Sequence, residues 1–333
     1  MSPSPQDPKK EADFLEQVTE NIQHGISANK HQFGLHLLQI FLVGLTIGMT
    51  RVVLPGLAQT EFGLAENAFF LLASFVVVFG IVKAVMNLFA GKLSDQHGRK
   101  TVLIWGWLVA LPIPFILLYA PDWNWIIAAT VLLGFNQGLC WSMALNSKLD
   151  LAKATQKGLV NGVNEFSGYA AVGLAGVVTA YFVELWGARD GLFLFSLTII
   201  TTGLILAKLT IVETLPWAEL HVSHTQSDLS HAPLSLGQLF KIASLENKQL
   251  VALNQAGLVE KFTDAIIWIF LPVFLLSKNL TLVQSGAIIS VYGMIWGGGQ
   301  LITGPLSDRI GRKPLIVWGM GLCGLGVLLI PYT

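Results

Sequence analysis

The sequence predicts an all-α integral membrane protein, a helical bundle of two repeated halves of which the second is incomplete. The prediction depends on composition, on hydrophobic patterning and on an internal repeat. Hydrophobic residues make up 53% of the 333 positions and charged residues only 12%, whereas soluble domains carry about 25% charged residues. Long apolar blocks recur along the chain, and a motif that begins at residue 91 returns at residue 304.

The apolar blocks are long enough to cross a membrane as helices. A helix needs roughly 20 apolar residues to span about 30 Å of hydrocarbon. Membrane β-strands would instead alternate over segments of about ten residues, and these blocks do not alternate. The expected spans are 33–58, 67–90, 101–120, 123–145, 159–184, 190–212, 249–276, 283–303 and 314–331.

Polar segments divide the spans into domains. Residues 1–32 are polar and charged and lack a cleavage site after a short apolar core, so we expect a cytoplasmic N-terminus and no cleaved signal peptide. Residues 33–212 form an N-terminal six-helix half. Residues 213–248 form a cytoplasmic central loop, in which 234–245 is expected to lie as an amphipathic helix along the inner membrane surface. Residues 249–333 supply the first three helices of the C-terminal half.

Positive charges in the loops predict the orientation of the chain. With the N-terminus inside, fourteen Lys and Arg residues lie on the cytoplasmic side, and only Arg189 and Lys278 lie on the other. We therefore expect a multi-pass protein of the cytoplasmic (inner) membrane whose N-terminus is cytoplasmic.

Several function classes have no support in the sequence. The 20 basic and 20 acidic residues balance, so no nucleic-acid partner is expected. Cys140 and Cys323 lie inside apolar blocks, and His221, His224 and His231 lack partners at metal-ligand spacing, so neither a disulfide framework nor a metal site is predicted. The nucleotide-binding and nucleophile motifs are missing too. We expect no enzyme and no cofactor.

The internal repeat relates two parts of the chain at a constant offset. Residues 91–106 read GKLSDQHGRKTVLIWG, and residues 304–319, which lie 213 positions later, read GPLSDRIGRKPLIVWG. The same offset aligns Gly80 with Gly293. Both copies follow an even-numbered span, so the halves have the same membrane orientation. Parallel repeats about an axis along the membrane normal are typical of secondary transporters.

The doubled motif resembles the signature of the major facilitator superfamily, Gly-x-Leu-x-Asp-x-x-Gly-Arg-Lys in the loops after spans 2 and 8. The resemblance covers nearly the whole chain. It implies a six-plus-six helical fold and a secondary active transporter that moves a small solute by alternating access. Two features depart from the family: Gly134 stands where many members carry Arg, and the fifth span lacks the Gly-Pro motif of drug antiporters. The second departure disfavours drug–proton antiport.

The repeat also predicts more chain than is present. Residues 121–212 should have mates near 334–425, beyond Thr333. The sequence is then either a fragment of a longer protein or a nine-span chain, and we favour the fragment.

The repeated motif is interpreted as a gating device. Its glycines permit tight turns, and its aspartate can pair with the nearby arginine or accept from a helix N-terminus. Such a cluster can hold two helices together in one conformation and release them in another. The alternative is that the charges only anchor topology. The gating set is Gly91, Asp95, Gly98, Arg99, Lys100, Gly304, Asp308, Gly311, Arg312 and Lys313.

Polar residues inside the spans are candidates for the substrate or ion pathway, because charge is costly in hydrocarbon. The offset aligns Arg51 with Asp264, and the resemblance places both around a central cavity, where a pair between them would satisfy both charges; the alternative is that each meets a polar neighbour in its own half. Glu165 is a further candidate proton carrier or an interhelical hydrogen-bond partner. The pathway candidates are Arg51, Asn136, Gln137, Trp141, Asn161, Asn164, Glu165, Asn254, Gln255, Glu260 and Asp264.

Three interpretations of function remain open. The first is a secondary transporter with a small-molecule substrate of unknown identity and a coupling proton or another ion, embedded in the lipid bilayer. The second is a transporter-like membrane sensor or assembly partner that does not transport, which would tolerate the loss of the charges inside the spans. The third is a non-functional truncated chain. Because those charges are present, we favour the first.

Overall fold

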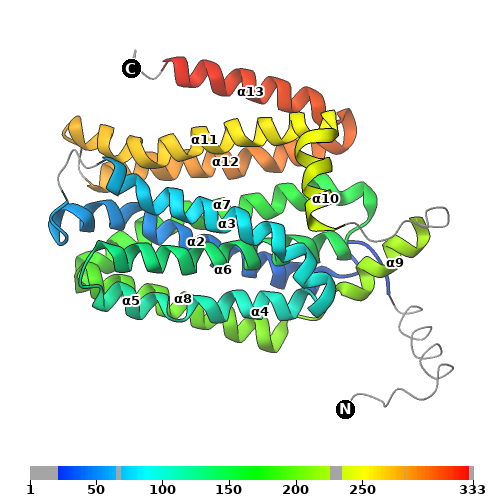
Figure 1. The fold of residues 1–333 in the computed structure, drawn as a ribbon, viewed down its shortest axis with the longest axis horizontal. Helices are drawn as coiled ribbons and strands as arrows, with labels where there is room; N and C mark the ends of the chain where they lie inside the picture. Colours follow the sequence, from blue (N-terminus) through cyan, green and yellow to red (C-terminus); the bar gives the residue numbers. More distant parts are fainter. Residues whose placement is uncertain (1–21, 65–68, 226–234, 281, 330–333) are drawn as a thin grey trace.

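The computed structural model describes residues 22–64, 69–225, 235–280 and 282–329. Over these residues the chain forms a bundle of long helices that run side by side, with no strand among them (Figure 1). Three C-terminal helices cover one side of the N-terminal bundle, and the last of them, α13 (Arg312–Leu329), is outermost.

The N-terminal half contains the predicted spans as helices, with one interruption. Its elements are α2 (Lys30–Thr60), α3 (Phe69–His97), α4 (Arg99–Ala110), α5 (Ile113–Tyr119), α6 (Trp123–Leu151), the 3₁₀ turn Ala154–Gln156, α7 (Lys157–Trp186) and α8 (Ala188–Thr210). The single span expected over 101–120 is broken between α4 and α5. The cause is Pro112, which supplies no N–H and clashes with the preceding turn of a continuing helix.

The central segment is more helical than expected. It contains α9 (Leu215–Thr225), α10 (Leu236–Lys241) and the π-helical turn Ile242–Glu246. Helix α9 was not predicted; Pro216 in its first turn has no N–H to leave unsatisfied, which favours a helix start there. Helix α10 begins at a capping box, in which Ser235 Oγ accepts from the Gln238 amide at 3.2 Å and Gln238 Oε1 accepts from the Ser235 amide at 2.9 Å. The described part of the helix predicted over 234–245 is thus present as α10 and the π-helical turn.

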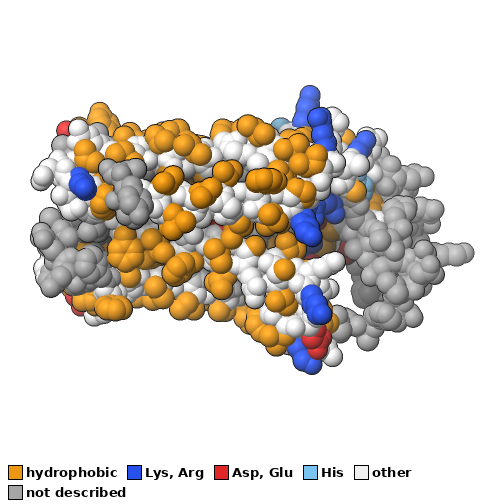
Figure 2. Space-filling view, turned by 90° about the horizontal axis from the view of Figure 1, so that it is seen from above, with side chains coloured by type: hydrophobic (Ala, Val, Ile, Leu, Met, Phe, Trp, Pro, Cys, Tyr) orange, Lys and Arg blue, Asp and Glu red, His pale blue; other side chains and the backbone are white. Residues whose placement is uncertain are grey.

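The remaining predicted spans correspond to α11 (Lys248–Ser277), α12 (Leu282–Ile310) and α13. Seven helical segments in the described chain are long and apolar enough to cross a membrane, and α11 and α12 are not among them. Helix α11 carries three charged side chains near its middle. Figure 2 shows hydrophobic side chains over most of one face, with most of the visible Lys and Arg toward one end. The protein is a multi-pass membrane protein.

Polar side chains tie the N-terminal helices together inside an apolar core. Trp107 on α4 is 0% exposed, and its Nε1 donates to Gln39 Oε1 on α2 at 2.7 Å. Gln39 Nε2 in turn donates to the Gly203 carbonyl of α8 at 3.2 Å. Helix α13, by contrast, buries none of its described side chains.

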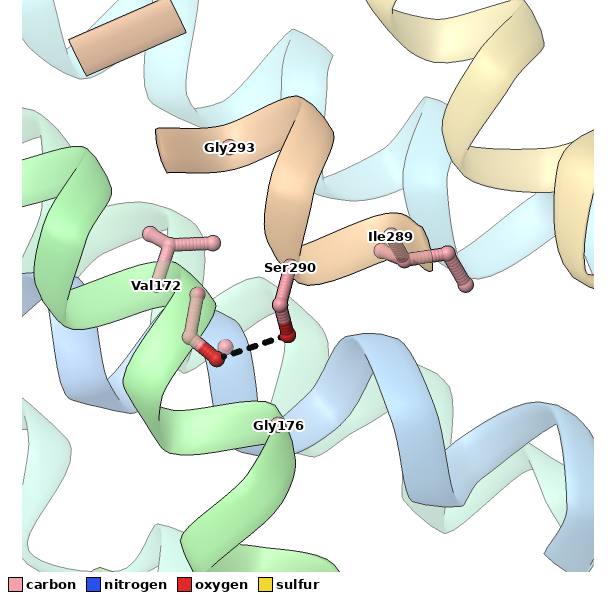
Figure 3. A pocket seen from close by; sticks show the side chains of 7 residues that line it. Val172, Gly176, Ile289, Ser290 and Gly293 are labelled. Atoms are coloured by element: carbon pink, nitrogen blue, oxygen red, sulfur yellow. Dashed lines mark hydrogen bonds between the residues drawn. The ribbon is translucent and has the colours of Figure 1, made fainter. Parts of the chain in front are cut away.

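Helices α7 and α12 form most of the contact between the two halves, and glycines allow it to be close. A Cβ on Gly304 would lie 2.6 Å from the Gly158 carbonyl oxygen, and one on Gly162 would overlap the Gln300 carbonyl. Towards the other end of the contact, Ser290 Oγ donates to the Gly173 carbonyl at 3.2 Å. That bond borders a small pocket between α2, α7 and α12 (Figure 3), lined by Gly48, Val172, Gly173, Gly176, Ile289, Ser290 and Gly293.

Candidate functional site

The sequence suggested that the two copies of the repeated motif lie in loops. In the structure, most of their residues belong to helices instead. Gly91 and Asp95 belong to the last turns of α3, Arg99 begins α4, and only Gly98 separates the helices. The second copy has the same layout, with Gly311 between α12 and α13. Gly98 has φ +86° and Gly311 φ +84°, a conformation that residues with a Cβ rarely adopt. The repeated glycines therefore permit an abrupt change of helix direction.

Arg99 is the centre of an ion-pair network within the first half. Its Nη1 lies 2.7 Å from Asp95 Oδ1, and its Nε lies 3.2 Å from Asp150 Oδ2 on α6. Nη1 also donates to Ser94 Oγ at 2.5 Å. The Arg99 and Asp150 side chains are 10% and 11% exposed, but Asp95 is 68% exposed. The buried ion pair is therefore the one with Asp150, which sequence reasoning missed.

Glu213 completes this network from the segment after α8, and it too was missed. Its Oε1 accepts from the Arg99 amide at 2.7 Å and its Oε2 from the Lys100 amide at 3.1 Å. These are the first two amides of α4, where a negative charge complements the helix dipole. A Cβ on Gly98 would overlap the Glu213 carboxylate. Gly98 thus permits the turn between the helices and also leaves room for the carboxylate that caps α4.

Asp308, the second motif aspartate, contacts the other half of the molecule. Its Oδ1 accepts from the Gly158 amide at 3.0 Å and its Oδ2 from the Leu159 amide at 3.2 Å. Asp308 lies on α12, whereas Gly158 and Leu159 form the first turn of α7. A carboxylate at a helix N-terminus is stabilised by both the free amides and the dipole. The remaining second-copy residues Arg312 and Lys313 are exposed at the start of α13.

A row of aromatic rings with two lysines lies between the halves. Lys83 Nζ of α3 is 4.7 Å from the Trp141 ring centroid on α6. Trp141 meets Tyr169 of α7 edge-on at 5.9 Å, and Tyr169 stacks on Trp296 of α12 at 5.1 Å. Lys261 Nζ of α11 is 4.6 Å from the Trp296 centroid. Five helices thus contribute to one cluster, which we call the central cluster.

Glu165 joins the central cluster from α7. Its Oε1 accepts from Trp141 Nε1 at 3.2 Å and from Asn164 Nδ2 at 2.9 Å. The predicted residues Trp141, Asn164 and Glu165 therefore meet. The interhelical hydrogen bond that the sequence offered as one role for Glu165 is present.

The charged residues of α11 complete the central cluster. Lys261 Nζ lies 3.1 Å from Glu260 Oε1 and donates to Tyr169 Oη at 3.0 Å. Asp264 is 6% exposed, and its Oδ1 accepts from Tyr292 Oη of α12 at 3.3 Å. The Arg51 side chain lies outside the described residues, so its pairing with Asp264 stays a prediction.

Asn136 and Gln137 lie elsewhere, inside the N-terminal half. Both are 0% exposed. Asn136 Nδ2 donates to the Gly106 carbonyl at 3.0 Å, and Gln137 Nε2 donates to the Val43 carbonyl at 2.9 Å. These bonds tie α6 to α4 and α2, which favours the packing role over substrate contact.

The other polar candidates also lie outside the central cluster. Asn161 Nδ2 donates to the Lys157 carbonyl at 2.8 Å within its own helix. Asn254 Nδ2 donates to the Ala243 carbonyl at 2.9 Å. Gln255 is exposed on α11. In the described part of the chain, no group of three or more His, Cys, Asp or Glu residues could hold a metal ion.

Sequence reasoning predicted Trp141 but missed the other aromatic residues of the central cluster. Tyr169, Tyr292 and Trp296 read as ordinary apolar residues of membrane helices. A signal was available in their spacing, since Tyr169 follows Glu165 by four positions and Trp296 follows Tyr292 by four. Residues four apart share one helix face.

Comparison with known proteins gives consistent matches. The model of the Major Facilitator Superfamily matches residues 37–333. A "Probable 4-methylmuconolactone transporter" of Cupriavidus pinatubonensis (strain JMP 134 / LMG 1197) is 25% identical over 81% of this chain and 60% of its own length. An "Uncharacterized MFS-type transporter YceJ" of Bacillus subtilis (strain 168) is 24% identical over 88% of this chain and 71% of its own. The chain therefore spans less than two thirds of the first relative.

A solved structure has the same fold. The proton:xylose symporter XylE, bound to 6-bromo-6-deoxy-D-glucose, superposes with a TM-score of 0.62 at 16% identity, over 86% of this chain and 71% of that one. The curated relatives are named as transporters and not as enzymes. Since the family match covers most of the sequence, the chain belongs to the major facilitator superfamily.

Proposed function

We propose that the protein is a secondary active transporter that moves a small solute across the cytoplasmic membrane by alternating access. The observation that carries the proposal is the Asp308 contact between the halves. It consists of two hydrogen bonds to the Gly158 and Leu159 amides, at 3.0 and 3.2 Å. Such a contact can break when the halves rotate and form again when they return, as a two-state gate requires.

The central cluster supports a pathway between the halves. It combines charged side chains with helices of both halves, and charged groups inside a membrane protein mark substrate or ion routes by default. We infer that Glu165 carries a coupling proton or interacts with another ion, because it links Trp141 and Asn164 at the centre of the cluster. An Arg51–Asp264 pair would add an ionic contact across the same space.

A charge-neutralising variant tests the gate. Asp308→Asn keeps the shape of the side chain but loses the charge that complements the α7 dipole. We expect a several-fold slower flux in liposomes, for a solute identified by ligand-induced thermal shift, with unchanged membrane insertion. The matched control is Asp122→Asn at the start of α6, where the aspartate accepts from the Asn124 amide at 2.8 Å within one half; this variant should transport like the parent.

The outcomes separate the functions. Equal flux in the Asp308→Asn variant and the parent would refute the gate. Saturable binding without flux in the parent would indicate a membrane sensor or assembly partner instead of a transporter.

The proposed orientation has its own test. Figure 2 shows most of the visible Lys and Arg toward one end of the molecule, which supports a cytoplasmic position for the N-terminus and residues 146–158 and 213–248. A single cysteine at residue 228, on a background without Cys140 and Cys323, should react only after the membrane is permeabilised. Labelling by an impermeant reagent from outside intact cells would contradict the orientation.

A further inference from the structure

We propose that Trp268 of α11 forms a second gate between the halves, an apolar one, at the end of the bundle opposite Asp308. This inference rests on the proposed function and names the residues that close the other side of the pathway. It is carried by a ring contact between α11 and α3, by the position of that contact beside the central cluster, and by the support that it receives from the first half.

Trp268 packs edge-on against two phenylalanines of the first half. Its ring centroid lies 6.2 Å from that of Phe75 and 5.9 Å from that of Phe79, with interplanar angles of 82° and 72°. Both phenylalanines are buried, with 4% and 7% of their surface exposed. Ala265, Trp268 and Ile269 share one face of α11 and pack against the core of the first half. The contact of these three rings, which we call the Trp268 contact, therefore joins the halves through apolar surface.

The Trp268 contact and the Asp308 contact lie toward opposite ends of the bundle. Trp268 belongs to the last third of α11 and Asp308 to the last turn of α12, and α12 runs back alongside α11 (Figure 1). Phe75 lies in the second turn of α3, whereas the first copy of the repeated motif ends that helix. The halves therefore meet through a polar contact toward one end and through an apolar contact toward the other.

The central cluster lies between these two contacts. On α3, Lys83 follows Phe79 by four positions, so the two share a helix face, and Lys83 Nζ is 5.8 Å from the Phe79 centroid. On α11, Lys261 precedes Trp268 by seven positions, which is roughly 10 Å along the helix axis. Trp296 lies at the middle of α12, and the polar contact forms at the end of that helix. A solute held at the central cluster must therefore pass one contact or the other to leave.

The first half holds its side of the Trp268 contact in place. Trp123 at the start of α6 meets Phe75 edge-on at 6.2 Å and Phe62 at 5.8 Å. The Arg189 guanidinium at the start of α8 lies 5.3 Å from the Phe62 centroid and donates to the Ala120 carbonyl at 2.7 Å. Phe75 thus belongs to a platform built by several elements of one half, and the Trp268 ring approaches that platform from the other half.

The chemistry of the Trp268 contact suits a barrier that opens and closes. Apolar constrictions stop the passage of polar solutes by excluding water. Edge-on ring contacts are held by dispersion and by the ring quadrupoles, and both attractions fall off quickly as the rings separate. A rotation of one half can therefore break the contact, and the return rotation restores it.

Distances at both ends of the bundle test the gate. Spin labels at residues 71 and 277, exposed positions near the start of α3 and at the end of α11, report on the end that carries the Trp268 contact. Labels at residues 155 and 310 report on the Asp308 end. Both pairs are read by double electron–electron resonance on the full chain in liposomes, on a background without Cys140 and Cys323.

Trp268→Ala removes the ring from the C-terminal half. We expect at least a threefold larger fraction of a longer distance between residues 71 and 277, with the distribution between residues 155 and 310 unchanged. Trp268→Phe keeps an aromatic ring and should stay close to the parent. Trp125→Ala is the matched control, because Trp125 is 49% exposed on α6, and it should give the distances of the parent.

Each result decides the proposal. An unchanged 71–277 distance in folded Trp268→Ala would overturn the gate. Equal broadening of both pairs would overturn it too, because the ring would then only stabilise the packing of the halves, and so would an equal change in Trp125→Ala. If Trp268→Ala does not fold, Trp268→Leu replaces it and must show the longer 71–277 distance.

The proposed function fails differently. A longer 71–277 distance in Trp268→Ala, together with no flux by the parent of the solute identified by ligand-induced thermal shift, would refute transport and leave the Trp268 contact as a conformational lock. Flux by the parent, together with unchanged distances in Trp268→Ala, would support transport and refute the aromatic gate.

Discussion

The two copies of the repeated motif share their residues but make different contacts. In the first copy Asp95 pairs with Arg99 on the same connection and is 68% exposed. In the second copy Asp308 accepts two amide hydrogen bonds from the start of α7, across the boundary between the halves. The α4 amides at the first copy are capped instead by Glu213. One copy stabilises its own half, and the other joins the two halves.

The comparison shows what a motif determines and what it leaves to its surroundings. Gly98 and Gly311 have nearly the same φ, +86° and +84°, so the repeated sequence yields the same turn twice. The partner of the aspartate depends on which helix begins nearby. Helix α7 begins beside the second copy, whereas Glu213 from the segment after α8 lies beside the first.

The largest expected effect concerns the buried pair of the first copy. Arg99→Met leaves Asp150 without its cationic partner at an 11% exposed position. Breaking a buried ion pair from one side costs about 3–5 kcal/mol. We expect this loss in the free energy of unfolding, measured in detergent by thermal and denaturant melts. Lys92→Met, at another basic residue near this end of α3, should change it little; equal losses would contradict the network.

Next comes the glycine contact between the halves. Gly162→Ala places a methyl group against the Gln300 carbonyl, and such overpacking costs about 1–3 kcal/mol. Gly298→Ala on α12 is the control, because a Cβ there meets nothing within 4 Å; it should be neutral or slightly stabilising. Melting temperatures that fall equally in both variants would show that α7 and α12 do not pack through Gly162.

The two carboxylate caps should have smaller and separable effects. Glu213→Gln and Asp308→Asn each weaken a cap worth about 1 kcal/mol. We expect Glu213→Gln to increase hydrogen exchange at the start of α4 and Asp308→Asn to increase it at the start of α7. Hydrogen exchange that rises at the same helix in both variants would contradict the assignment of Glu213 to α4 and of Asp308 to α7.

The smallest effect is expected at Asp95. Asp95 is 68% exposed although Arg99 is not, and ion pairs that solvent screens contribute about 0–1 kcal/mol. Asp95→Asn should therefore leave the melting temperature close to that of the parent. A loss as large as that of Arg99→Met would mean that Asp95, and not Asp150, supplies the essential charge.

Much of the fold was accessible from the sequence, because a bilayer demands long apolar helices and the repeat relates the halves. The exceptions have local causes: Pro112 divides one predicted span, and α9 forms in a segment read as a loop. The candidate site was less accessible. Glu165 and Asp264 stand out as charges in apolar helices. Glu213 and Asp150 contact Arg99, from which they are distant in the sequence, and no local pattern predicts these contacts. The ring stacking of Tyr169 on Trp296 likewise joins residues from different halves.

The contact between the halves can be measured directly as a distance. Spin labels at residues 155 and 310, exposed positions near the start of α7 and at the end of α12, would be read by double electron–electron resonance on a background without Cys140 and Cys323. The parent should show a short, narrow distance, Asp308→Asn should gain a longer population, and Asp95→Asn should match the parent. Identical distributions in the parent and Asp308→Asn, or an equal shift in Asp95→Asn, would contradict the assignment of the inter-half contact to Asp308.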